Sequence, residues 1–128
     1  MANFVKYFFL INVLNGINVG HNVINSSQVG VPIEFELSLD IPDNEVLYVN
    51  LMYNANTGTS FTSKIMNKNI DGYYICVLPN NFIKSKSIKY YFMIQLENQG
   101  IVTLPDYRPD SNPFNIDLYF PEEEKSSV

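Results

Sequence analysis

Hydrophobic and polar residues alternate with a period of two along Ser87–Leu96. Apolar or aromatic side chains occupy every second position from Ile88 to Leu96, and Lys89, Tyr91, Met93 and Gln95 fall between them. Such alternation, rich in aromatic and β-branched residues, is typical of a β-strand with one buried face. The sequence Asn98-Gln99-Gly100 then predicts a turn into a second strand over Ile101–Leu104.

Shorter stretches with the same period recur along the chain. They are Ile17–Asn25, which we interpret as an edge strand, then Val31–Leu39, Glu45–Asn54, Ser60–Met66, Tyr73–Leu78 and Phe114–Phe120. Turn signals separate them, among them Ser26–Gly30, Asp40–Asn44 and the dipeptide Asp71-Gly72. No stretch has the 3.6-residue apolar period of a capped helix. The pattern therefore predicts an all-β chain, a single antiparallel β-sandwich of seven to eight strands.

Composition adds limits to this fold. The chain has 128 residues, which suits one domain, and 46% of them are hydrophobic. Its net charge is −5 with Arg108 as the single arginine, so it lacks the basic surface of a nucleic-acid-binding protein. Cys76 is the single cysteine, which excludes an intrachain disulfide, and its apolar flanks predict a small buried side chain.

The two ends of the chain differ from its middle. Residues 1–16 form an apolar leader in which Lys6 precedes the apolar run Tyr7–Leu14, and residues 122–128 form an acidic tail. The leader is too short to span a bilayer. It has the order of a signal peptide, which predicts export to the periplasm, the medium or the cell surface. The alternative is a first β-strand or a segment docked on a partner. The sandwich itself is expected over 17–121.

Catalytic and metal-binding motifs are absent from the sequence. His21 is the single histidine, and no nucleophile elbow, zinc-protease or P-loop pattern occurs. Glu34 and Glu36 lie on one face of a strand, where solvation explains them best. We therefore expect neither an enzyme nor a cofactor. A surface calcium site stays open, because several loop and strand aspartates could supply oxygen ligands: Asp40, Asp43, Asp106, Asp110 and Asp117.

Several of these landmarks together resemble a recurring bacterial module. They are Gly30-Val31-Pro32-Ile33, Val49–Tyr53 before Gly58, Gly72–Pro79, Ile88–Ile94 and Asn98-Gln99-Gly100 with Pro105 after it. In this order they resemble an immunoglobulin-like or fibronectin type III-like β-sandwich. Such modules typically carry an arginine where this chain has Asn54. The resemblance implies a linker, an adhesion unit, a carbohydrate-binding module or an assembly subunit, and it names no site residue.

One sheet face has an unusual composition for a solvated surface. If Val49 and Leu51 point inward, Tyr48 and Met52 point outward; by the same alternation Tyr91 and Met93 point outward. The two strands are neighbours in an immunoglobulin-like sandwich. Exposed apolar patches rich in Tyr and Met are typical of partner surfaces. We therefore expect a non-catalytic interaction or assembly module that binds a protein partner or a second copy through Tyr48, Met52, Tyr91 and Met93.

Two alternatives stand beside this expectation. The leader or the segment Pro105–Pro113 could cover the face, which would make it part of the fold. The same tyrosines could instead act as stacking platforms of a carbohydrate-binding module in an exported protein, although the chain has no tryptophan.

Overall fold

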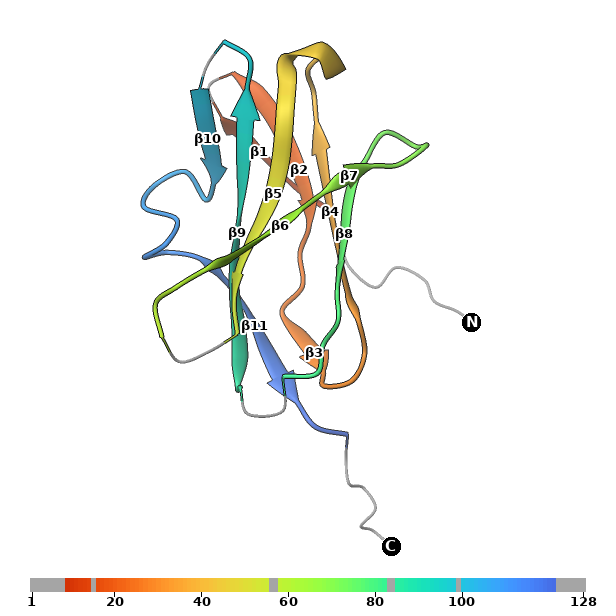
Figure 1. Ribbon diagram of the computed structural model, residues 1–128, viewed down its shortest axis with the longest axis vertical. Coiled ribbons are helices and arrows are strands. Elements are labelled where there is room, and N and C mark those ends of the chain that lie inside the picture. The colour runs from red at the N-terminus through yellow and green to blue at the C-terminus, as the bar shows by residue number, and fades with distance from the viewer. Residues whose placement is uncertain (1–8, 15, 56–57, 83–84, 99, 122–128) are drawn as a thin grey trace, which may run out of the picture.

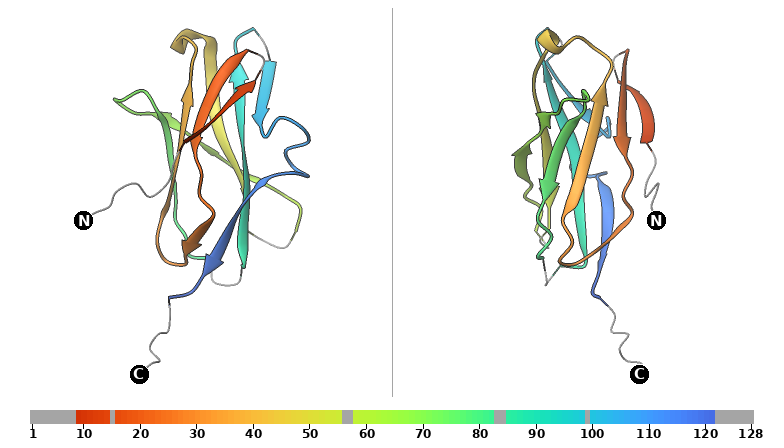
Figure 2. Two further views of the ribbon diagram at one scale, coloured as in Figure 1. Left: turned by 180° about the vertical axis from the view of Figure 1, so that it is seen from behind. Right: turned by 90° about the vertical axis from the view of Figure 1, so that its right-hand side faces the viewer.

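Two β-sheets packed face to face form the structure, a computed structural model that describes residues 9–14, 16–55, 58–82, 85–98 and 100–121 (Figures 1 and 2). Sheet A has the order β1 (Phe9–Leu14), β2 (Ile17–Asn22), β4 (Ile33–Leu39), β8 (Tyr74–Leu78) and β7 (Asn67–Lys68). Sheet B has the order β3 (Ser26–Gln28), β11 (Phe114–Tyr119), β9 (Ser87–Leu96), β5 (Val46–Asn54) and β6 (Thr62–Ile65), and β10 (Gly100–Leu104) also pairs with β9. A 3-10 turn, η1 (Asp43–Glu45), precedes β5.

The predicted all-β class with two packed sheets is confirmed, but the strands are more numerous than expected. The described residues contain eleven strands rather than seven or eight. Ser26–Gln28 was expected to be a turn; it is β3, which pairs in parallel with Asp117–Tyr119 of β11. Such a short strand carries no periodic signal of its own, since its pairing depends on a strand far away in the sequence.

Two expectations near the N-terminal half were wrong. The strand at Ile17 is not an edge strand, because β1 pairs with it from Phe9↔Asn22 to Leu14↔Ile17. The strand expected over Val31–Leu39 begins only at Ile33, and Val31 is exposed. The preceding Gly30 has φ 99°, a conformation that turns the chain before the strand.

The core lies between the inner faces of the two sheets and is centred on β9. Alternate residues of β9 from Ile88 to Leu96 are buried, as the alternation predicts. Phe35 of β4 packs edge-on against Tyr90, with ring centroids 5.0 Å apart, and Tyr90 in turn contacts Phe92 at 5.7 Å. Edge-to-face pairs at such distances add to the stabilisation from buried area.

His21 belongs to this aromatic core. It is fully buried, and its ring lies 4.8 Å from that of Phe114 and 5.6 Å from that of Phe92. Nδ1 lies 3.1 Å from the carbonyl oxygen of Asn22, whereas Nε2 is buried without a partner among the described residues. Burial lowers the pKa of His21 and outweighs the opposing effect of the Asn22 contact. The histidine is therefore a neutral core residue.

The side chain of Asn22 anchors the end of β2 to β4 by hydrogen bonds. The pairing of β2 with β4 ends at His21↔Leu37. Beyond that point the Asn22 side chain takes the place of backbone, since its Oδ1 accepts a hydrogen bond from Glu36 N (2.8 Å) and its Nδ2 donates one to Glu34 O (2.9 Å). The side-chain amide of Asn22 thus pairs with two backbone groups of β4, as the backbone of a neighbouring strand would.

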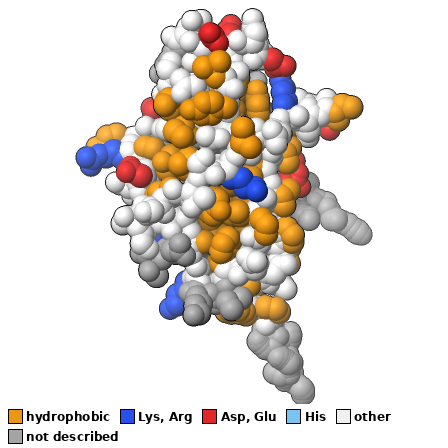
Figure 3. Space-filling model, in the orientation of Figure 1, with side chains coloured by type: hydrophobic (Ala, Val, Ile, Leu, Met, Phe, Trp, Pro, Cys, Tyr) orange, Lys and Arg blue, Asp and Glu red, His pale blue; other side chains and the backbone are white. Residues whose placement is uncertain are grey.

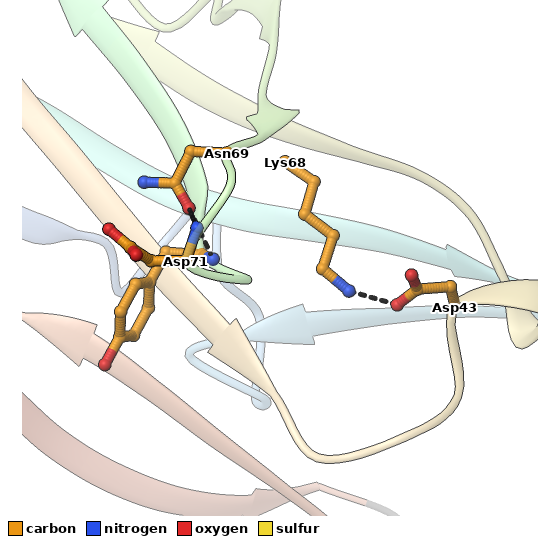
Figure 4. A network of polar contacts seen from close by, with 5 residues as sticks. Asp43, Lys68, Asn69 and Asp71 are labelled. Atoms are coloured by element: carbon orange, nitrogen blue, oxygen red, sulfur yellow. Dashed lines mark hydrogen bonds and ion pairs between the residues drawn. The ribbon is translucent and has the colours of Figure 1, made fainter.

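A polar turn closes the hairpin between β7 and β8 (Figure 4). Asn69 Oδ1 accepts hydrogen bonds from the backbone N–H groups of Asp71 (3.0 Å) and Tyr73 (2.9 Å). Lys68 forms an ion pair with Asp43, which joins this hairpin to the loop before β5. Gly72 has φ 92°, so the turn dipeptide Asp71-Gly72 supplies the residue that this backbone shape needs.

Candidate functional site: the outer face of sheet B

The four residues singled out in the sequence lie together on the outer face of sheet B. Tyr48 and Met52 come from β5, Tyr91 and Met93 from β9, and these strands are directly paired. Met52 lies opposite Tyr91, and Asn50 opposite Met93, so the side chains form one continuous surface. A β-bulge at Leu47 interrupts the alternation, so that Val46 lies opposite the inner residue Leu96 and Tyr48 opposite the outer residue Gln95.

The surface is partly open to solvent. Tyr48 is 38% exposed and its hydroxyl donates to Gln95 Oε1 (3.2 Å), while Met52, Tyr91 and Met93 are half-buried. Figure 3 looks onto this face and shows hydrophobic side chains across its middle, where charged side chains are few. A solvated antiparallel sheet normally carries polar side chains on this side.

Two further apolar side chains enlarge the surface and a third borders it, and the sequence reasoning missed them. Ile65 of β6, 58% exposed, lies opposite Asn50, and Ile101 of β10, 53% exposed, lies opposite Gln95. Phe61 packs edge-on against Tyr91 with centroids 5.1 Å apart. Ile101 could have been identified from the sequence, because alternation along β10 places it on the face opposite to Val102 and Leu104, which are buried. We call Tyr48, Met52, Ile65, Tyr91, Met93 and Ile101 the Tyr/Met face.

The covering elements considered in the sequence reach little of this face. The described part of the leader is β1, at the far edge of sheet A, on the opposite side of the molecule (Figure 2, left); residues 1–8 lie outside the described part. In the segment 105–113, Asp110 lies near enough to Tyr91 to act on it electrostatically. Burial raises the pKa of Tyr91, and the carboxylate of Asp110 raises it further.

A small hollow lies at one end of the face. Its volume is about 230 Å³, and it is lined by Asn54, Gly58, Thr59, Phe61, Lys89 and Asp110. Lys89 and Asp110 line the hollow without pairing with each other. Asn54 Nδ2 donates to Gly58 O (2.7 Å), which holds one wall in place. The hollow therefore combines an aromatic ring with separated charges of both signs.

The remaining candidate residues do not form a reactive centre within the described residues. Cys76 is buried, as predicted, and burial raises the pKa of its thiol, with nearby Lys64 opposing. Glu34 is exposed on the outer face of sheet A. Nowhere in the described ranges do three His, Cys, Asp or Glu side chains come close enough to hold a metal ion, and this includes the aspartates considered for calcium.

No helix in the described part of the chain is long and apolar enough to cross a membrane. Comparison of the chain with protein-family models, with curated proteins and with solved structures found no match.

Proposed function

We propose that this protein is a non-catalytic interaction module that binds a protein partner through the Tyr/Met face. The observation that carries the proposal is the continuity of half-buried and exposed apolar side chains over four adjacent strands, β6, β5, β9 and β10. Isolated exposed apolar residues are common on proteins, but a contiguous patch on a flat sheet is not. Tyr and Met are also the residue types that adapt to and anchor a partner.

We also propose that the fold is of the immunoglobulin-like type. The order β2-β4-β8-β7 in one sheet and β11-β9-β5-β6 in the other supports this, because it matches the A-B-E-D and G-F-C-C′ orders of such domains. In that arrangement the Tyr/Met face is the outer side of the G-F-C sheet. A shared fold does not fix a function, so the surface itself carries the functional proposal.

The proposal is tested by adding one charge to the face. Met93→Glu or Tyr91→Glu should leave the circular dichroism spectrum unchanged, because both side chains point away from the core. Each should abolish partner binding, since an unpaired buried carboxylate is costly in an apolar interface. A second copy is the simplest partner, so sedimentation velocity of the purified chain is the first readout. Val77→Glu, which adds the same charge to an exposed position of sheet A, is the matched control.

A carbohydrate is the second candidate ligand, and the hollow at the end of the face favours it. An aromatic ring beside hydrogen-bonding side chains suits a sugar ring, whose apolar face stacks while its hydroxyls pair. The hollow, at about 230 Å³, is smaller than drug-sized sites of roughly 300–1,000 Å³, so it would take one ring.

A glycan array distinguishes this candidate from the protein partner. Binding that is lost in Phe61→Ala and kept in Met93→Glu would assign the hollow to a sugar. An array without any signal would remove the candidate and leave the protein-partner proposal untouched.

A further inference from the structure

Strand β1 (Phe9–Leu14) is an edge strand whose outer side pairs with no described residue. It forms a hairpin with β2, and Leu14 and Ile17 flank its two-residue turn. In a hairpin of this length the closing pair exchanges both backbone hydrogen bonds, and hydrogen-bonded pairs then alternate. The backbone N–H and C=O groups of Ile11 and Val13 therefore point to the free edge, while the backbone groups of Asn12 bond to β2.

Other edge strands of the sandwich are protected in the usual ways. β7 and β3 have two and three residues. β6 carries Lys64 opposite Leu51, a charge on the inner side of its edge, and β10 begins at Gly100 and stops at Pro105. Short length, inward charge and flanking proline all discourage pairing between molecules.

β1 has none of these features. With six residues it is the longest edge strand among the described ones, and its sequence FLINVL contains no charge, proline or glycine. Ile11 and Val13 are 59% and 68% exposed and share the outer face of sheet A. An apolar edge of this kind is a template for another strand.

Asn12 adds an observation that specifies which strand fits. It lies opposite Val19, on the inner side of β1, and its Oδ1 is buried without a hydrogen-bond partner among the described residues. A buried amide oxygen without a partner destabilises the fold, and such atoms are rare in native proteins. A strand that places an amide N–H beside Asn12 would remove this cost.

We propose that β1 pairs with β1 of a second copy of this chain, antiparallel, about a two-fold axis at Asn12. Sheet faces must match across the pair, so only registers that join outer residues to outer residues are allowed. In the register centred on Asn12, Ile11 of one copy lies opposite Val13 of the other, and their edge-facing backbone groups exchange hydrogen bonds.

The same register brings the two Asn12 side chains together. They form a non-hydrogen-bonded pair, in which the Cα atoms lie about 4.5 Å apart and side chains are closest. Each Asn12 Nδ2 can then donate to the other copy's Oδ1. A strand from an unrelated protein would need an amide at this one position, whereas a second copy supplies it by symmetry. In coiled coils, a single buried Asn can fix the register of the paired helices. The two copies of sheet A then form one continuous sheet.

The first test is the mass, by sedimentation velocity, of the full chain carrying Met93→Glu, which removes any association of two copies through the Tyr/Met face. We expect a dimer that becomes a monomer in Ile11→Lys, because an edge lysine opposes strand pairing while the exposed side chain leaves the fold intact. Val77→Lys adds the same charge to another exposed position of sheet A, beside Glu34, and should remain dimeric. A full chain that stays monomeric, or an Ile11→Lys chain that stays dimeric, overturns the proposal.

The second test addresses the register. Asn12→Cys should form a disulfide-linked dimer under mild oxidation, because Cα atoms about 4.5 Å apart lie within the range of disulfides. Cys76 is buried, so the unmodified chain serves as the background. Ile11→Cys should link poorly, since the two copies of position 11 are offset along the strands. Efficient linking through position 11 and none through position 12 would contradict the register.

This dimer goes beyond the proposed function and does not rest on it. Met93→Glu alters sheet B and should leave the β1 dimer intact, whereas Ile11→Lys should leave binding at the Tyr/Met face intact. The intact mass of the protein from its own cells adds a further outcome. A mature chain beginning near Ile17 lacks β1 and would overturn the proposal, while a chain that retains β1 supports it.

Discussion

Replacing Asn22 with alanine tests how the chain is fastened as it passes from sheet A to sheet B. The side chain is 1% exposed and makes two hydrogen bonds with the backbone of β4, at 2.8 and 2.9 Å. Asn22→Ala removes both partners, and the Glu36 N–H and the Glu34 C=O lose the groups that replace a neighbouring strand. The substitution should therefore destabilise the fold far more than an ordinary surface change.

The magnitude follows from the two bonds. Each net hydrogen bond contributes about 0.5–1.5 kcal/mol, and a buried backbone group left unpaired costs about 1–3 kcal/mol. The surroundings are only partly buried, so water can reach some of the freed groups. The expected loss is about 2–4 kcal/mol of unfolding free energy, a large part of the roughly 5–15 kcal/mol of a typical domain.

Urea denaturation followed by circular dichroism measures this loss. The midpoint should fall while the slope of the transition stays the same, since the folded and unfolded surfaces hardly change. Asn18→Ala, on the exposed side of the same strand, is the control and should cost under about 0.5 kcal/mol. A loss below about 1 kcal/mol in Asn22→Ala would show that the side chain does not replace backbone pairing.

Three further outcomes can be measured in the same way. Burial lowers the pKa of His21 from its ordinary 6.5, so as the pH falls the unfolded chain takes up the histidine proton before the folded chain does. The contribution of His21 to the unfolding free energy is therefore complete above pH 6.5 and is lost below it, by at most about 1.4 kcal/mol per pH unit. His21→Phe should flatten this acid slope, and equal slopes in both proteins would contradict the assignment. Phe92→Ala should cost about 3–5 kcal/mol in urea, because the ring is fully buried. Gly72→Ala should cost about 1 kcal/mol of unfolding free energy, because its φ of 92° is unfavourable for alanine although the added Cβ meets nothing within 4 Å. Gly58→Ala is the control: its φ is not positive, so the substitution should be neutral or stabilising.

Alternation of side chains identified the parts of the fold in which one face is buried along the whole strand. β9 is the clearest case, because each of its inner residues from Ile88 to Leu96 is buried. The same reasoning placed Tyr48, Met52, Tyr91 and Met93 on one face. It worked there because β5 and β9 are long central strands, whose register fixes both sides at once.

The rest depends on partners that are distant in the sequence. β3 exists because β11 lies beside it, and no local pattern in three residues signals that pairing. Ile65 joins the Tyr/Met face only through its position opposite Asn50 on β5. A first β-strand was one of the alternatives to a signal peptide for the leader, since an apolar run of this length suits both equally, and its pairing with β2 was not predicted.

The central claim is that the Tyr/Met face binds a protein, and photo-crosslinking from position 93 tests it most directly. A photoreactive side chain replaces Met93 in the full chain, in the cells that make it, and Val77 of sheet A carries the same group in the control. The account predicts a discrete adduct from position 93 that disappears when Tyr91→Glu is added. Adducts that form equally from both positions, or that persist with Tyr91→Glu, would contradict it.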